Sequence, residues 1–177
     1  NLVKVTVGAT DSQIQSLNDQ AQALQEIGVV NKENITGIRN KKISPDYIII
    51  THDDFYQQAI QLESLRENWS IKDRLETEIV NYSDVIKEFG WGIPDPAAIR
   101  NFLAWAQDHW NSPRYVLLIG DGHYDYKDLL RQRIPNLIVP YETEGTSENY
   151  TRTTDDWFTY TRGENAGMQM AIGRLTV

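Results

Sequence analysis

The sequence predicts an α/β fold in which a mostly parallel sheet carries helices on both faces. Short, continuously apolar segments such as residues 46–51 and 114–120 are typical of strands buried on both sides. Segments with helical spacing of apolar residues lie between them. Strands that alternate with helices in this way form doubly wound sheets. The 177 residues, of which 40% are hydrophobic, suffice for one sizeable core.

The region before the first buried strand contains weaker signals. Residues 2–7 predict a short strand, and residues 12–28 predict a helix that ends at Gly28, because glycine commonly follows the last turn of a helix. From Val29 to Pro45 the pattern weakens into a connection.

The buried strand over residues 46–51 begins the alternation. Asp53 is expected to cap the helix that follows, over residues 54–69, since a carboxylate at this position accepts hydrogen bonds from free helix amides. Residues 77–81 predict a second short strand, and residues 83–90 predict a brief helix.

The strongest helix signal follows. Asp95 is a predicted cap, and Pro96 takes the first helical position, where its missing N–H is not needed. The apolar stripe of this helix predicts packing on the sheet and consists of Ile99, Phe102, Leu103, Ala106 and Trp110. Residues 114–120 predict the third buried strand. Residues 168–177 contain a fourth, after a polar region interrupted by proline and glycine.

Composition excludes several classes of function. The formal charge of −8 argues against a nucleic-acid partner, because phosphate contacts need clustered lysine and arginine. The sequence has no apolar run long enough to cross a bilayer, so no membrane span is expected. The absence of cysteine excludes disulfides, thiolate metal ligands and a thiol nucleophile within these 177 residues.

Acidic residues follow the ends of two predicted strands, where ligands bind in open parallel sheets. Asp121 and Asp125 are candidate ligands of a hard cation, since clustered carboxylates suit such ions. A second interpretation is Mg²⁺-dependent phosphoryl transfer or a receiver-like domain, with Asp53 and Asp54 holding the ion beside a phospho-accepting Asp121. In the simplest interpretation these acids only cap helices and satisfy turn amides.

Six segments resemble, in order, the first half of the catalytic region of gingipain-like cysteine peptidases. They cover roughly residues 46–177, the first beginning at Pro45, and read PDYIIITHDDF, EFGWGIPDPAAIRNFLAWA, YVLLIGDGHYDYKD, IPNLIVPY, TTDDWF and AIGRLTV. Several ordered blocks are much harder to obtain by chance than one short motif.

The resemblance implies a caspase-like fold of two side-by-side subdomains, the second of which carries a catalytic histidine and cysteine. Residues 46–177 are then expected to be the first, non-catalytic subdomain, and residues 1–45 the tail of a preceding region with its connector. The implied partners are a downstream catalytic subdomain of the same polypeptide and a peptide substrate, in an extracellular or cell-surface setting. The chain alone is expected to be inactive.

The resemblance also implies site residues. Asp155 matches an aspartate that lines the primary specificity pocket of arginine-cleaving gingipains, and Asp156, one residue away, competes for that role. No cofactor is required, although the resemblance makes structural calcium an expectation. A pure scaffold or docking domain remains a further alternative.

Overall fold

The computed structural model describes residues 11–26, 37–68, 74–126, 129–131, 133, 135–144 and 151–177. The chain divides into two compact units, Asn1–Ile35 and Thr36–Val177. In the first unit, helix α1 (Asp11–Glu26) matches most of the helix predicted over residues 12–28. The strand predicted over residues 2–7 and the predicted stop at Gly28 lie outside the described residues.

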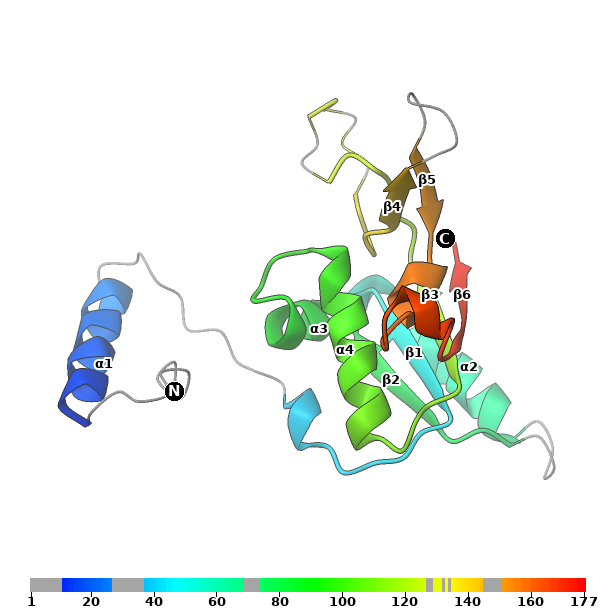
Figure 1. Cartoon of the computed structure of the whole chain (residues 1–177), viewed down its shortest axis with the longest axis horizontal. Helices are drawn as coiled ribbons and strands as arrows, with labels where there is room; N and C mark the ends of the chain where they lie inside the picture. The colour runs from blue at the N-terminus through cyan, green and yellow to red at the C-terminus, as the bar shows by residue number, and fades with distance from the viewer. Residues whose placement is uncertain are drawn as a thin grey trace. The chain divides into compact units, whose positions relative to one another are not determined.

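The second unit is built on a parallel four-stranded sheet in the order β2-β1-β3-β6 (Figure 1). The strands are β1 (Tyr47–Thr51), β2 (Thr77–Asn81), β3 (Tyr115–Ile119) and β6 (Ala171–Leu175). All five residues of β1 are buried, as its unbroken apolar run predicted. These are the four strands predicted between residues 46 and 177.

Helices cover both faces of this sheet, which confirms the predicted fold class. Helix α2 (Tyr56–Asn68) packs through Ala59 onto the face formed by Ile49, Ile79 and Ile119. Helices α3 (Tyr82–Phe89) and α4 (Pro96–His109) cover the opposite face, onto which a short turn, η2 (Ile38–Asn40), also packs. The larger core therefore lies between the sheet and α3 with α4.

Helix α4 forms as its sequence predicted. The Asp95 carboxylate accepts a hydrogen bond from the Ala97 amide at 2.7 Å, and Pro96 occupies the first turn. Its predicted apolar stripe is fully buried at Ile99, Phe102, Leu103, Ala106 and Trp110. Trp91, in contrast, lies in the turn before this helix and is 83% exposed.

The start of α2 differs from the prediction. A short 3-10 turn, η3 (Asp53–Phe55), precedes the helix, and its cap is His52, whose Nδ1 accepts the Asp54 amide hydrogen at 3.3 Å. Asp53 instead accepts a hydrogen bond from the Ser83 hydroxyl at 3.1 Å. The predicted capping role of Asp53 is wrong because the chain turns one residue earlier than the helical pattern suggested.

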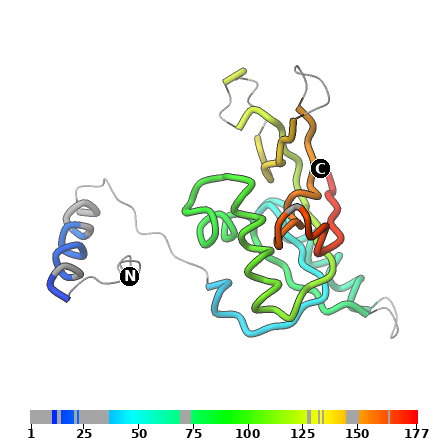
Figure 2. Tube along the Cα trace, viewed as in Figure 1, coloured from blue at the N-terminus to red at the C-terminus, as the bar shows by residue number. Residues whose placement is uncertain are grey.

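The segment between β3 and β6, whose path can be followed in Figure 2, contains elements that the sequence did not predict. An antiparallel hairpin pairs β4 (Tyr141–Glu144) with β5 (Thr151–Thr154), and two short turns follow, η4 (Asp156–Thr159) and η5 (Glu164–Ala166). Within η4, Phe158 is fully buried in the larger core, so the chain returns along the α4 face before entering β6. No helix in the described residues is long and apolar enough to cross a membrane.

Candidate functional site

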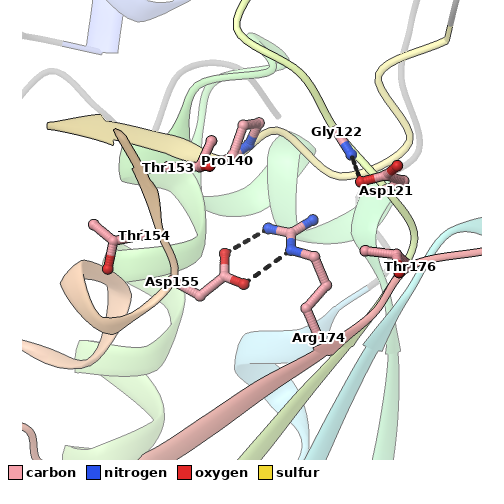
Figure 3. Close-up of a pocket in the computed structure, with 8 residues that line it drawn as sticks. All are labelled: Asp121, Gly122, Pro140, Thr153, Thr154, Asp155, Arg174 and Thr176. Atoms are coloured by element: carbon pink, nitrogen blue, oxygen red, sulfur yellow. Dashed lines mark hydrogen bonds and ion pairs between the residues drawn. The ribbon is translucent and has the colours of Figure 1, made fainter. Parts of the chain in front are cut away.

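A pocket of about 190 Å³ opens where β3 and β6 end (Figure 3). Its walls come from the loop after β3, the base of the β4–β5 hairpin and the end of β6. The residues that line it are Asp121, Gly122, Pro140, Thr153, Thr154, Asp155, Arg174 and Thr176. Carboxyl ends of parallel strands are the usual ligand-binding edge of such sheets, so this pocket is the candidate functional site.

The wall of the pocket contains a two-point ion pair. Arg174 donates from Nε to one oxygen of Asp155 at 2.9 Å and from Nη2 to the other at 2.7 Å. Its Nη1 donates to the carbonyl oxygens of Gly120 and Ile138, each at 2.9 Å. The two charged side chains are only 11% and 22% exposed. Arg174 therefore connects the loop after β3, the segment before β4 and the residue after β5.

The loop after β3 is folded tightly back on itself. The carbonyl oxygen of Asp121 accepts the amide hydrogens of Leu137 and Ile138, each at 3.0 Å. The Asn136 side chain accepts from the His123 amide at 2.9 Å and donates to the His123 carbonyl at 2.8 Å. These bonds hold residues 121–123 against residues 136–138 and fix one wall of the pocket.

Two tyrosines hold the segment before β4, which contributes Pro140 to the pocket. The Val139 amide donates to the buried Tyr82 hydroxyl at 3.4 Å, and the Tyr126 hydroxyl donates to the Pro140 carbonyl oxygen. Burial raises the pKa of Tyr82 above its ordinary value, against a smaller opposing effect of the Val139 hydrogen bond. The raised pKa means that the folded chain favours the neutral phenol.

Tyr82→Phe is expected to lower the free energy of unfolding at neutral pH by about 1 kcal/mol, because the buried Val139 amide loses its acceptor. Because the pKa of Tyr82 is higher in the folded chain than in the unfolded chain, where it is about 10, this group contributes its full stability only at pH values below about 10. At higher pH the unfolded chain loses the phenol proton first, and the free energy of unfolding decreases. The variant should therefore lose less stability than the parent between about pH 7 and pH 10.5. Urea unfolding at both pH values measures this, and an equal loss in both proteins would contradict it.

The predicted metal ligands lie in the same loop but have different surroundings. The oxygens of the buried Asp125 accept the amide hydrogens of Leu129 at 2.9 Å and Leu130 at 2.8 Å. Asp121 is exposed and lines the pocket. Within the described part of the chain, no three His, Cys, Asp or Glu side chains gather as a metal site, and these two carboxylates do not make the oxygen-rich shell that calcium takes. Calcium binding stays a prediction.

The other predicted acids lie outside the pocket lining. Asp53 faces Ser83, and the Asp54 carboxylate lies 3.4 Å from His52 Nδ1. Asp156 is exposed at the start of η4, where its amide donates to the Thr154 hydroxyl. Of the two acids predicted to bind substrate, Asp155 lines the pocket.

Sequence reasoning missed Arg174, although its position contained a signal. In β6, Ile172 and Arg174 point to the face that carries the larger core, since alternate strand residues share a face. A charged side chain on a core face needs a partner of opposite charge. The strand therefore required a nearby acid, and Asp155 supplies it.

Comparisons with known proteins agree with this architecture. The profile of peptidase family C25 matches residues 40–177. A similar solved structure is that of dimeric latent PorU from Porphyromonas gingivalis, with 25% sequence identity and a TM-score of 0.64. The match covers 84% of this chain and 15% of the PorU chain. No curated protein sequence matches the chain significantly.

Proposed function

This chain belongs to peptidase family C25, the gingipain family, and on that premise we propose that it is the non-catalytic subdomain of a longer cysteine endopeptidase. The gingipain-like peptidase region itself is established by the family match and by the similarity to PorU. The proposal concerns the part that the chain plays: it forms one wall of the substrate cleft, and the reacting groups belong to another part of the polypeptide.

One observation carries the proposal. The pocket at the carboxyl edge of β3 and β6 is polar and lies within the residues that match the family. Its walls are fixed by Arg174, which bonds both carboxylate oxygens of Asp155 and two carbonyl oxygens of neighbouring loops. A pocket held in this way is suited to orienting a substrate side chain, since positioning needs side chains that do not move.

In this proposal, cleavage of the peptide bond is carried out by residues outside this chain. A cysteine peptidase attacks the peptide carbonyl with a thiolate that a histidine helps to activate, and an acyl-enzyme forms. These 177 residues contain no cysteine, so they cannot provide the thiolate. In the proposal they bind the side chain next to the cleaved bond and hold the carbonyl within reach of a downstream catalytic subdomain. The proposed setting is extracellular or at the cell surface.

The predicted roles of the two acids enter this proposal differently. Asp155 is part of the pocket wall, while Asp156 faces solvent outside the lining residues. The family assignment favours a peptidase over the phosphoryl-transfer alternative built on Asp53, Asp54 and Asp121. A scaffold or docking role remains the competing proposal, and it differs in expecting no substrate at the pocket.

Photocrosslinking tests the proposal. A peptide inhibitor that alkylates the catalytic thiol, with a photoreactive side chain before the scissile bond, should crosslink the longer polypeptide at residues 121–122 or 153–155. The reason is that these segments line the pocket. The 177-residue chain alone should hydrolyse no peptide, because it contains no thiol.

Two results would overturn this assignment. Crosslinks found solely in other segments would leave the pocket without a substrate and favour the scaffold alternative. Hydrolysis by the purified chain alone, insensitive to thiol alkylators, would place the reacting groups within these residues.

A further inference from the structure

We infer that the turn joining helices α3 and α4 is a docking surface, and that Trp91 in this turn inserts into an apolar cleft on another part of the same longer polypeptide. The turn comprises residues 90–94, Gly-Trp-Gly-Ile-Pro, and is called the Trp91 turn below (Figure 1). The inference rests on the proposed function for the existence of that polypeptide. It concerns a surface that does not line the pocket.

The Trp91 turn exposes apolar side chains with no charge among them. Trp91 is 83% exposed and Ile93 is 62% exposed, and Gly92 and Pro94 are exposed as well. Within the part of the chain that the structure describes, the Trp91 indole forms no hydrogen bond and stacks on no other ring. Exposed apolar patches mark interaction sites, and tryptophan is among the residues that contribute most to the affinity of protein interfaces.

The backbone at Trp91 is unfavourable for a tryptophan. Its φ is 58°, in the left-handed region, where the residue after a helix is usually glycine because a β-carbon is strained there. The next residue is a glycine, Gly92, and it also has a positive φ, of 79°. No hydrogen bond or ring contact of the indole within the described residues offsets the strain at Trp91. Strain that is retained at an exposed side chain points to a functional contact.

The backbone beneath the exposed side chain is fixed. The carbonyl oxygen of Ile86 accepts the amide hydrogens of Gly90 at 2.9 Å and Gly92 at 3.0 Å, and the Ile93 amide donates to the Gly90 carbonyl oxygen at 2.9 Å. A β-carbon added at Gly90 would lie 2.7 Å from the β-carbon of Ala98, so the turn packs closely onto α4. An interface segment that is fixed before binding loses little conformational entropy on docking, which favours affinity.

The charges around the turn favour a protein cleft over a lipid surface. Segments that bind membrane surfaces place lysine and arginine beside their aromatic residues, since these cations attract anionic lipids. Here two acids, Glu88 and Asp95, flank the turn together with one lysine, Lys87, and the formal charge of the chain is −8. Electrostatic repulsion from anionic lipid therefore opposes insertion of Trp91 into a membrane.

A cleft on the same polypeptide is favoured over one on a separate protein. The residues that match PorU make up only a small part of the PorU chain, so a polypeptide of that kind has large surfaces outside this region. A contact within one polypeptide benefits from a high effective concentration and covers the turn at all times. Permanent cover is advantageous, because an exposed apolar patch promotes aggregation.

The solvent exposure of the indole measures docking directly. The 177-residue chain and the longer polypeptide are each labelled with 5-fluorotryptophan, and Trp91→Phe identifies the ¹⁹F signal of Trp91. In the 177-residue chain this signal should show the H₂O/D₂O isotope shift of a solvated indole, because the side chain is 83% exposed. In the longer polypeptide most of that isotope shift should be lost. An equal isotope shift in both proteins would overturn the inference.

Trp91→Gly gives a second readout, whose sign depends on docking. In the 177-residue chain glycine relieves the left-handed strain and removes little burial, so the urea midpoint should rise. In the longer polypeptide the loss of a buried indole should lower the midpoint instead. A rise in both proteins would contradict docking.

Asn111→Gly is the matched control for this second readout. Asn111 also follows a helix, has a φ of 58° and is exposed, but its side chain is polar. Its replacement should therefore shift the urea midpoint in the same direction in both proteins. Opposite shifts for Asn111→Gly as well would show that the sign change at Trp91 comes from the longer polypeptide in general, which would refute a specific contact of Trp91.

The remaining outcomes separate the inference from its alternatives. If phosphatidylcholine vesicles reduce the isotope shift of Trp91 in the longer polypeptide, the turn is free to enter lipid and the inference is wrong. Substrate crosslinks at the pocket together with an exposed Trp91 would refute docking alone. A buried Trp91 in a polypeptide whose pocket forms no crosslink would support docking and refute the proposed wall of the substrate cleft.

Discussion

Arg174→Met should lower the free energy of unfolding of the chain by about 3 kcal/mol. Methionine retains much of the apolar volume and removes the guanidinium, so the Asp155 carboxylate, 22% exposed, loses both of its charged donors. The carbonyl oxygens of Gly120 and Ile138 lose their hydrogen bonds from Nη1 in the same change. Urea unfolding at neutral pH measures the loss.

Arg114→Met is the matched control for this prediction. Arg114 also pairs with an aspartate, Asp46, at 2.9 Å, but these side chains are 59% and 36% exposed. Exposed pairs contribute little, so this variant should lose less than about 1 kcal/mol. Arg174→Lys keeps the charge without the planar fork and should fall between the two. Equal losses for Arg174→Met and Arg114→Met would show that the buried pair does not hold the pocket walls together.

Much of the fold could be predicted from local patterns in the sequence. An unbroken apolar run identifies strands β1 and β3 within a few residues. The Asp-Pro pair at its start identifies helix α4 in the same way. The sheet edge that carries the site follows as well, since parallel strands end together. Local pattern and tertiary structure agree at these positions.

The details of the site depend on contacts that a local pattern does not contain. Asp155 was predicted from a family resemblance, but its partner Arg174 is 19 residues away and was not predicted. The β4–β5 hairpin was missed because its strands, YETE and TRTT, are polar and lack the alternation of a half-buried strand. Asp53 was predicted to cap the helix that follows it, whereas its carboxylate accepts a hydrogen bond from Ser83 in helix α3.

Gly122→Ala should have an effect of similar size on the other wall of the pocket, a loss of about 3 kcal/mol in the free energy of unfolding. A β-carbon at this position would overlap the Ile138 carbonyl oxygen and lie 2.7 Å from Asn136 Oδ1. Ile138 is fixed by two further bonds, from its amide to Asp121 and from Arg174 to its carbonyl, so the backbone cannot move away without breaking them.

Gly173→Ala tests whether this loss comes from the close approach and not from glycine replacement in general. Gly173 lies in β6, near the same edge, but no atom lies within 4 Å of its added β-carbon, so the free energy of unfolding should change by less than about 0.5 kcal/mol. Urea unfolding of both variants gives the comparison, and amide spectra show whether residues 121–123 and 136–138 move. Equal stability of the two variants would mean that the loop after β3 can shift to accommodate the added methyl group of Gly122→Ala.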